Sequence, residues 1–299
     1  MDIEDLKKFL VVAQSNNLHL ASAELHITPG ALSKTIRRIE DRLNTRLFDR
    51  TGRNIVLNQQ GVKFRQYALH LVHEAEQAIS EFTGESRKTT VNVVGPSLIL
   101  QHFLPDVVSK VSSESFEFNV EANWEGQALT KVATGQSHLA FVTRVALDQS
   151  SYTVDFERIV MGSSKFTVVA SKHHSLFNQF SDGALNLEQL CQFGFACPDV
   201  SPFCGITRGR GSDNWPDEKS PRTITYRCND FSMLMSLVKN GKALAYVPDF
   251  VAYNNNLAVI DVTDFNHEWE EHIELIYKPS LASGWLNRFA HSVARAGQH

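Results

Sequence analysis

The sequence contains few of the residues that mark secreted, membrane or zinc-binding proteins. Only four of its 299 residues are cysteines, and none has the C-x-x-C spacing of a zinc ribbon or a redox dithiol. Its longest apolar runs, such as SLIL and FLVVA, are far shorter than the roughly 20 residues that cross a bilayer. The first segment, MDIEDLKKFLVVAQ, has acids before its apolar residues and no small-residue cleavage site. We therefore expect a soluble, cytoplasmic protein without a disulfide framework.

Signatures of catalysis and of metal binding are missing as well. No Ser-His-Asp arrangement, Walker motif or nucleotide-binding glycine motif is visible. Four of the twelve histidines form two close pairs, His70/His73 and His173/His174, without an Asp, Glu or Cys at metal-ligand spacing. We therefore expect no catalytic residue, no metal and no cofactor, and we do not expect an enzyme.

Length and charge indicate several domains with different roles. A chain of 299 residues exceeds the roughly 100–200 residues of one domain, and a hydrophobic content of 42% can supply real cores. The formal net charge is -4, yet residues 33–53 hold seven Lys and Arg against three Asp and Glu. Net charge can hide such a local patch, which is able to bind a polyanion. A solvated surface helix is the ordinary alternative.

Three helical patterns follow one another in the first 45 residues. The first ends at the polar cluster of residues 15–17, and the second is short, with small residues around Ala21. The third begins with Thr28 as a plausible N-cap and Pro29 at the first helical position. Its apolar face repeats at helical spacing at Leu32, Ile36, Ile39 and Leu43. Two short helices joined by a tight turn predict a helix-turn-helix, whose second helix can enter the major groove of DNA.

Residues near the start of that second helix are expected to approach base edges. These candidates are Thr28, Pro29, Ala31, Ser33, Lys34 and Arg37, while Arg38 is expected to contact phosphates. The next segment, RLFDRTGRNIVLN, predicts two strands joined by a turn at residues 51–52. This wing would place Arg50, Arg53 and Asn54 for contacts to the DNA backbone or minor groove.

A long helix is predicted after the wing, because no proline occurs from Gln59 to Phe82. Apolar residues step by 4, 3, 4, 3 and 4 through Phe64, Ala68, Leu71, Ala75, Ala78 and Phe82. This heptad spacing is typical of helices that pair, and a dimer would require a roughly palindromic DNA site. The same stripe could instead pack on the chain's own domain. The segment TGESRKTT then ends the helix as a linker.

Several short motifs stand out in the first 61 residues. They are Ala21-Ser22 in the second helix, Thr28-Pro29-Gly30-Ala31-Leu32-Ser33 in the third, Ile39-Glu40, Leu47-Phe48-Asp49-Arg50 and Leu57-Asn58-Gln59-Gln60-Gly61. Together they resemble the N-terminal domain of LysR-type transcriptional regulators. Ser22, Asn44 and Asn58 depart mildly from the family pattern without removing the core or the basic face. The resemblance implies a winged helix-turn-helix over residues 1–58 and a dimerising linker helix over residues 59–89.

Beyond Thr90 the pattern changes to alternating strands and helices. Runs that predict strands are VNVVG, SFEFNVEA, LAFV, FTVVAS, FGFA, TITYR, LAYVP, LAVIDV and HIELIY. Helical segments lie between several of them, which predicts α/β units with largely parallel sheets. Ligands of such sheets bind in a crevice at the carboxyl ends of the strands.

Longer fragments of this half extend the resemblance, more loosely, to the effector-binding domain of the same family. They are HFLPDVV, ALTKVATGQSHLAFV, VVASKHHSL and LVKNGKALAYVPDFV. The resemblance implies a two-lobed α/β domain over residues 90–299, built like a periplasmic solute-binding protein. Lobe one is expected over 90–162 and 267–299, and lobe two over 163–266. His138 replaces a usual Asp, a departure expected to affect the edge of the crevice or the hinge.

Ten cleft residues follow from this resemblance by position. They are Ser97, Ile99, Trp124, Glu125, Thr143, Arg144, Phe203, Cys204, Asn229 and Asp230. Asn229 or Asp230 could instead cap the helix that follows, which is the commoner role at a helix start. Arg144 could neutralise an anionic effector, and a surface ion pair is an equally open role.

Cys197 and Cys204 lie near the position of the reactive cysteine in the peroxide-sensing branch of the family. Where that branch has its second cysteine this sequence has Asp213, so redox sensing would need Cys197 or Cys228 as a partner. Buried, inert thiols are the commoner state of cysteine. A thiol- or oxidant-sensing regulator is therefore the alternative to one controlled by a small-molecule effector.

The resemblance thus implies a sequence-specific transcription regulator controlled through its C-terminal cleft. The expected partners are double-stranded DNA, a small-molecule or oxidant effector, a second copy of the chain and, as a further candidate, RNA polymerase. The family tendency is a homotetramer built from two dimers, and no membrane partner is expected. The competing class is an enzyme or solute-binding module with an incidental basic helix, which would bind DNA weakly and without sequence preference.

Overall fold

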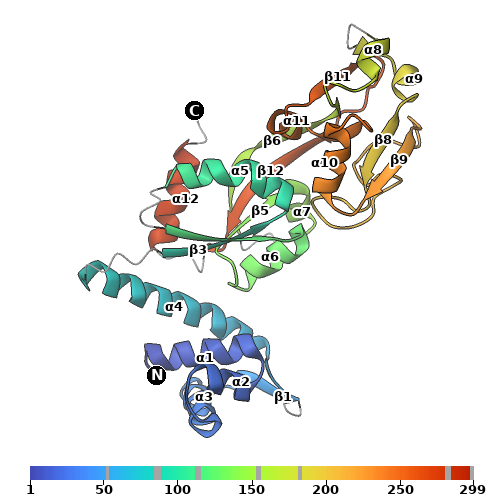
Figure 1. Ribbon diagram of the computed structural model, residues 1–299. Helices are drawn as coiled ribbons and strands as arrows, with labels where there is room; N and C mark the ends of the chain where they lie inside the picture. The colour runs from blue at the N-terminus through green and yellow to red at the C-terminus, as the bar shows by residue number, and fades with distance from the viewer. Residues whose placement is uncertain are drawn as a thin grey trace.

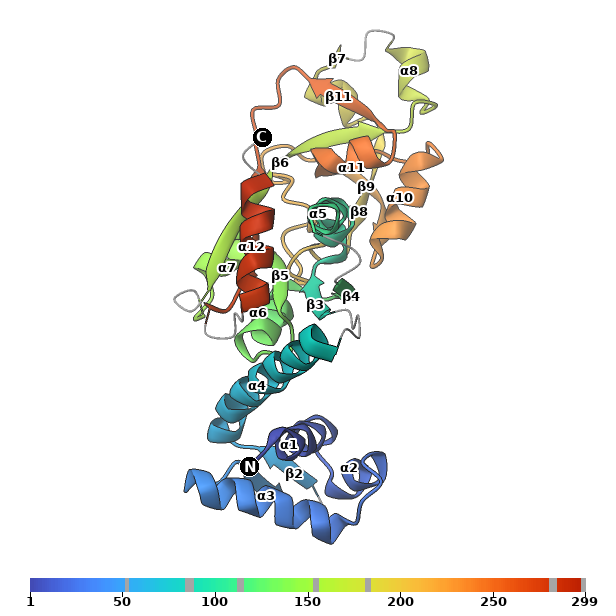
Figure 2. The ribbon, with the colours of Figure 1, turned by 90° about the vertical axis from the view of Figure 1, so that its left-hand side faces the viewer.

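The computed structural model describes residues 1–51, 54–83, 89–111, 116–152, 156–180, 184–279 and 284–296. A small N-terminal domain, one long helix and a two-lobed domain follow one another along the molecule (Figures 1 and 2). Over these described ranges, we find no helix with both the length and the apolar character that a bilayer crossing requires.

Three helices and a hairpin form the N-terminal domain. They are α1 (Ile3–Ser15), α2 (Leu18–Glu24), α3 (Pro29–Leu43), β1 (Phe48–Thr51) and β2 (Asn54–Leu57), and the two strands pair antiparallel. Thr28 caps α3, since its Oγ1 accepts the N–H of Ala31 at 3.2 Å, and Pro29 occupies the first turn. Asn44 ends α3 in the left-handed conformation, with φ of 49°. The start, cap and type of the third predicted helix are thus confirmed.

The apolar face of α3 anchors it in the N-terminal core. Its buried residues include Leu32, Ile36 and Ile39, as the helical spacing predicts. The prediction for Leu43 is wrong, because this last residue of the helix reaches past the core and is 37% exposed. Buried Glu40 accepts the N–H of Leu47 at 2.8 Å and pairs with Arg46 at 2.7 Å, which ties α3 to the hairpin.

The helix α4 (Gln59–Thr83) starts against the same domain. Gly61 of its first turn lies so close to the Leu47 carbonyl oxygen that a Cβ would stand 1.9 Å from it, which only glycine avoids. Phe64 meets Phe9 edge-on, with 4.9 Å between ring centroids, and Ala68 is fully buried. The start of the heptad stripe therefore packs on the chain's own domain, as the alternative interpretation proposed.

The outer part of α4 leaves apolar side chains in solvent. Tyr67, Leu71 and Ile79 are 51%, 46% and 60% exposed. The side chain of Phe82, the last position of the predicted stripe, lies outside the described residues. Along its length α4 therefore changes from a core helix to one with an uncovered apolar face.

Lobe one contains a sheet with helices on its faces. Its elements are β3 (Thr89–Gly95), α5 (Ser97–Ser109), β4 (Phe116–Ala122), α6 (Glu125–Ala133), β5 (Leu139–Thr143), α7 (Arg144–Asp148), the first part of β6 (Glu157–Ala170), β12 (Glu270–Tyr277) and α12 (Gly284–Ala296). Leu286, Phe289 and Val293 of α12 are buried against this sheet. In Figure 2, α12 and α5 lie beside the sheet, and α6 lies nearest to α4.

Lobe two is built from the rest of β6 and the segment up to β12. Its elements are α8 (Leu176–Gln179), β7 (Ala184–Leu185), α9 (Leu187–Leu190), β8 (Gly194–Pro198), β9 (Thr223–Cys228), α10 (Phe231–Lys239), β10 (Ala245–Pro248), α11 (Asp249–Asn254) and β11 (Ala258–Val262). Each of the nine runs that predict a strand overlaps one of the strands of the two lobes.

A continuous sheet in the order β4-β3-β5-β12-β6-β11-β7 runs through both lobes, with β10 also paired to β6. β3 pairs parallel with β4 and β5, and β8 pairs parallel with β9. β12 and β6 pair antiparallel, however, because the chain leaves lobe one along β6 and returns along β12. The expectation of largely parallel sheets is therefore only partly right, and the sheet is mixed.

Candidate DNA interface and effector cleft

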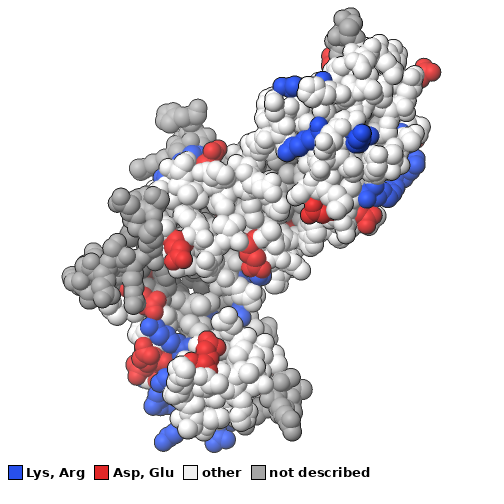
Figure 3. Space-filling model, viewed as in Figure 1, with Lys and Arg blue, Asp and Glu red and all other residues white. Residues whose placement is uncertain are grey.

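The polar side of α3 faces solvent. Of the residues expected at base edges, Thr28, Ala31, Lys34 and Arg37 are exposed, while Pro29 and Ser33 are half-buried. Figure 3 shows Lys and Arg side chains along the lower edge of the N-terminal domain, where Figure 1 places α3. These candidates thus share one accessible, locally basic surface at one end of the molecule.

Arg38 differs from its neighbours because it has a partner inside the domain. Its guanidinium pairs with the carboxylate of Asp5, which is only 1% exposed. Burial alone would raise the pKa of Asp5, but the hydrogen bond and charge of Arg38 outweigh it and lower the pKa. Arg38 therefore joins α3 to α1. Its predicted contact with phosphate stays a prediction.

The wing residues are only partly described. Arg50 and Asn54 lie at the turn end of the paired strands β1 and β2, and nothing is described of their side chains. Arg53 lies outside the described residues. The predicted hairpin is present in the described strands, and the predicted contacts of these three residues stay predictions.

Two cavities lie between the lobes, and they divide the predicted cleft residues. The first, which we call the Glu125 cavity, has a volume of about 410 Å³ and includes Glu125, Thr143, Phe203 and Cys204. The second, the Asn229 cavity, measures about 490 Å³ and includes Ser97, Trp124, Asn229 and Asp230. Eight of the ten predicted residues thus line one cavity or the other.

Trp124 lies where the two lobes meet. Gly205 of lobe two has φ of +70°, and a Cβ there would stand 2.5 Å from the Trp124 ring. The next residue, Glu125, donates its backbone N–H to the carbonyl of Phe203 at 3.1 Å. The start of α6 is therefore fastened to the β8–β9 loop of the opposite lobe.

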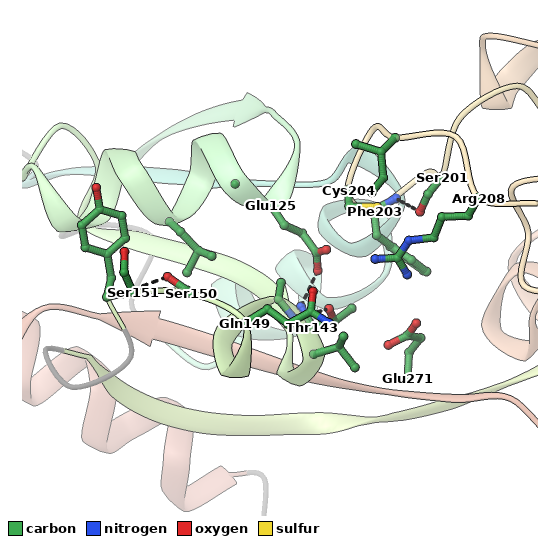
Figure 4. A pocket seen from close by; sticks show the side chains of 16 residues that line it. Glu125, Thr143, Gln149, Ser150, Ser151, Ser201, Phe203, Cys204, Arg208 and Glu271 are labelled. Carbon is green, nitrogen blue, oxygen red and sulfur yellow. Dashed lines mark hydrogen bonds between the residues drawn. The ribbon is translucent and has the colours of Figure 1, made fainter.

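The Glu125 cavity brings charged side chains from three separate segments together (Figure 4). Glu125, at the start of α6, and Glu271, in β12, are 4% and 3% exposed. Arg208 comes from the β8–β9 loop, and its guanidinium end points toward the space between the two carboxylates. Burial raises the pKa of both carboxyls, and the positive charge of Arg208 partly opposes that rise.

Sequence reasoning identified Glu125 but missed Glu271 and Arg208. Glu271 lies just before the run HIELIY, so the strand predicted from that run begins one residue too late to include it. Arg208 lies in a long irregular loop. No local motif distinguishes either residue from other charged residues of the chain. An acidic residue at the second position of a buried central strand was the only signal available for Glu271.

In the Asn229 cavity, one predicted residue also has a structural role. Asp230 caps α10, because its carboxylate accepts the N–H of Met233 at 2.9 Å. The capping role left open for this residue is thus confirmed. Lys239, Gln101 and Asn254 add polar groups to the wall.

Two of the ten predicted cleft residues line neither of these cavities. Ile99 is fully buried in the apolar core of lobe one, because its position on α5 faces the sheet. Arg144 starts α7 and pairs with buried Glu274 at 2.8 Å. Geometry therefore gives no support for Ile99 or Arg144 as effector contacts, and Arg144 has the ion-pair role left open for it.

His138 does not lie at the crevice as expected. The Nδ1 atom of its ring accepts the backbone N–H of Asn92 at 2.9 Å, and the backbone N–H of His138 donates to the Asn92 carbonyl at 2.9 Å. These bonds lie at the amino end of β5, whereas Thr143 at the opposite end of that strand lines the Glu125 cavity. The prediction of a place at the crevice edge is wrong, because the residue before a strand lies a full strand length from its carboxyl end, and the predicted effect on the hinge stays a prediction.

The cysteines show little of the chemistry that a thiol sensor needs. All four are free thiols; Cys197 and Cys228 are buried, and burial raises the pKa of both. Asp213 adds negative charge beside Cys197, which further disfavours its thiolate. Cys204 is half-buried in the Glu125 cavity.

The described residues also contain no group of three side chains that could hold a metal ion.

Comparisons with known proteins match both halves of the chain. A model described as "Bacterial regulatory helix-turn-helix protein, lysR family" matches residues 3–62, and one described as "LysR substrate binding domain" matches residues 84–296. An uncharacterised HTH-type transcriptional regulator of Bacillus subtilis, YxjO, is 36% identical over 117 residues, which are 37% of this chain and 40% of the relative. The chain aligns with less than half the length of the first curated relatives, which also include DgdR of Burkholderia cepacia and IlvY of Escherichia coli.

Solved full-length regulators share the fold. LysG of Corynebacterium glutamicum, solved with its bound effector Arg, superposes with a TM-score of 0.66 at 15% identity over 100% of this chain and 98% of its own. CbnR, solved in complex with its target DNA, superposes with a TM-score of 0.52 at 16% identity over 99% of this chain and 100% of its own. The similarity therefore extends from the N-terminal domain through both lobes.

Proposed function

Because the chain belongs to the LysR family, we propose that it is a DNA-binding transcription regulator controlled by an effector in the cleft between its lobes. The observation that carries this proposal is the combination of an exposed basic helix at one end and, between the lobes, cavities lined by both polar and apolar residues. In this proposal the chain acts in the cytoplasm and is not an enzyme. The proposed units are residues 1–58, 59–89 and 90–299.

Sequence-specific contacts are proposed for the exposed side of α3. Ser33, Lys34 and Arg37 lie near its N-terminal half, opposite the buried apolar face that fixes the orientation of the helix. A helix docked in the major groove brings such side chains to base edges. Thr28, Pro29 and Ala31 are proposed to approach the same base pairs, and Arg50, Arg53 and Asn54 to contact the DNA backbone or minor groove.

Self-association is proposed through the outer part of α4. Leu71 and Ile79 are large apolar residues left in solvent on a helix whose first half is already packed. A second copy of α4 would cover them and place two α3 helices on one duplex. The resulting dimer would require a roughly palindromic operator, and two dimers would give the homotetramer expected from the resemblance.

Helix α6 offers a direct route from the cleft to the DNA-binding half. Its first residue, Glu125, lines the Glu125 cavity, and its last residue, Ala133, contacts α4. There Gln66 of α4 donates to the Ala133 carbonyl at 2.6 Å, and Lys278 donates to the same carbonyl at 3.1 Å. An effector that shifts α6 would therefore shift the base of α4, provided that it binds the two lobe arrangements with different affinity.

Selection of DNA from a random library by the full-length protein tests the regulator proposal. We expect enrichment of a roughly palindromic site and binding that weakens as salt rises. The double variant Ser33→Ala/Lys34→Ala should lose the preference for that site but keep its folding. Lys165→Ala, an exposed change on β6, is the matched control and should select the same site. Enrichment of no sequence, or an unchanged preference in the double variant, would contradict the proposal.

A further inference from the structure

Glu271 has a carboxylate oxygen that is buried but unused. Its Oε1 accepts the indole N–H of Trp269 at 2.8 Å, whereas its Oε2 has no hydrogen-bond partner among the described residues. The residue is only 3% exposed and lines the Glu125 cavity. Buried polar atoms are nearly always hydrogen-bonded, so an orphaned carboxylate oxygen at a cavity wall indicates a missing donor.

A second buried carboxylate makes the missing donor a cationic one. Glu125 lies close enough to Glu271 for their negative charges to repel, which contributes to the raised pKa of Glu125. Its Oε1 accepts the backbone N–H of Thr143 at 2.6 Å, a neutral donor. Arg208 attracts both carboxylates, but one guanidinium cannot balance two of them. A positively charged ligand would remove the excess negative charge and satisfy the free oxygen.

The rest of the lining fits an organic cation better than a metal ion. Apolar surface comes from Leu129, Val145, Phe203 and Ile206, which suits a hydrocarbon stem. No set of three metal-ligating side chains exists among the described residues, and two carboxylates beside an arginine supply too few oxygen ligands for a metal ion. The cavity volume of about 410 Å³ lies in the range of small-molecule sites.

We propose that the Glu125 cavity binds a small amphipathic organic cation whose ammonium group donates to Oε2 of Glu271 while its apolar stem packs on Leu129 and Phe203. The proposal deepens the proposed function, because it names the chemical class that the effector cleft accepts. In the absence of ligand, Arg208 supplies the positive charge near the two carboxylates, and the ligand's ammonium group competes with it for them. Hydrogen bonds to charged groups are among the strongest that a site can offer, so the charge should dominate selectivity.

Matched pairs of amines and alcohols test this proposal on the full-length protein. The probes are n-butylamine and n-hexylamine, each compared with 1-butanol and 1-hexanol at pH 7.5, and Kd is measured by ligand-detected NMR. Each amine is expected to bind about tenfold more tightly than the alcohol of equal length, with hexyl chains better than butyl. Equal affinity within each pair, or binding by neither probe, would overturn the proposal.

Three variants make the test specific to the cavity. Glu271→Gln should bring the amine-to-alcohol ratio close to one, while Glu268→Gln, which changes a carboxylate that is 83% exposed, should leave it unchanged. Arg208→Ala should strengthen amine binding because it removes the competing positive charge, an increase that loss of structure alone would not produce. A preference for amines that survives Glu271→Gln, or weaker amine binding in Arg208→Ala, contradicts the proposal.

DNA selection with the same preparations separates this proposal from the one on which it rests. A protein that selects a palindromic site but does not distinguish amines from alcohols retains its regulator function and loses only the ligand class. A protein that distinguishes amines but selects no DNA site retains the cation site and loses the regulator function.

Discussion

Charged residues occupy opposite environments at the two ends of this molecule. On α3, Lys34 and Arg37 are exposed, and their apolar neighbours fix the helix below them. In the cleft, Glu125 and Glu271 are almost fully buried, and the guanidinium end of Arg208 points toward the space between them. Exposed charges cost the fold little and remain available to a large partner, whereas buried charges destabilise the fold unless something pairs with them.

Lobe two shows what a buried charge looks like when its partners come from the same chain. Arg222 has a fully buried side chain, and it bonds to the two carboxylate oxygens of Asp213 at 2.8 and 2.6 Å. Its guanidinium also lies 4.9 Å from the Trp215 ring centroid. The comparison teaches that a buried charge in this protein can find all its partners within the chain, whereas Oε2 of Glu271, at a cavity wall, has none among the described residues.

The largest effect is expected from breaking the internally paired cluster. Asp213→Ala leaves Arg222 buried with only Asp217, 3.1 Å away, as a carboxylate partner. Removing one member of a buried pair typically costs about 3–5 kcal/mol of unfolding free energy. Urea unfolding of the full-length protein measures the loss, and Lys165→Ala, which breaks an exposed pair, should cost no more than about 1 kcal/mol. Equal costs for the two variants would show that burial is not the decisive difference.

An intermediate effect is expected at the exposed end. Arg37→Ala removes a side chain that contributes nothing to the core, so the unfolding free energy should stay nearly constant. Affinity for the selected DNA site should fall by about 1–3 kcal/mol if Arg37 makes a bidentate base contact. Fluorescence anisotropy at fixed salt measures the change, with Lys172→Ala in lobe two as a control that should bind DNA normally. A loss of stability without a loss of affinity would reverse the proposed roles of the two ends.

The smallest effect is expected at the contact that joins the two halves. Gln66→Ala combined with Lys278→Ala removes both side-chain hydrogen bonds to the Ala133 carbonyl and the 3.2 Å bond between Gln66 and Lys278. The bond from Arg65 of α4 to the Thr134 carbonyl at 3.2 Å remains. A typical hydrogen bond contributes about 0.5–1.5 kcal/mol to the unfolding free energy. The total loss should be smaller than the sum of the separate bonds, because two of them share the Ala133 carbonyl as their acceptor. Hydrogen exchange should rise in both α4 and α6. Unchanged exchange in α6 would argue against its role as the connection.

Local sequence patterns were sufficient for elements whose signal lies within a few residues. The 3.6-residue spacing predicted the buried face of α3, and Thr28-Pro29 predicted its start, because capping and propensity act over one helical turn. The strands followed from short apolar runs in the same way. Leu43 and His138 failed because the surroundings of a residue at the end of an element depend on what the rest of the chain places there.

The sequence by itself determined the order of elements, the basic face of α3 and its apolar anchor, since each depends on neighbours along the chain. Only the tertiary structure decided which charges meet. The paired strands β6 and β12 run between the lobes, and this arrangement brings Glu125, Arg208 and Glu271 to one cavity. No periodic pattern in the sequence predicts that these three residues are neighbours. The same holds for Gln66, Ala133 and Lys278 at the base of α4. Long-range packing sets these contacts, because two residues distant in sequence become neighbours only when the whole sheet has formed.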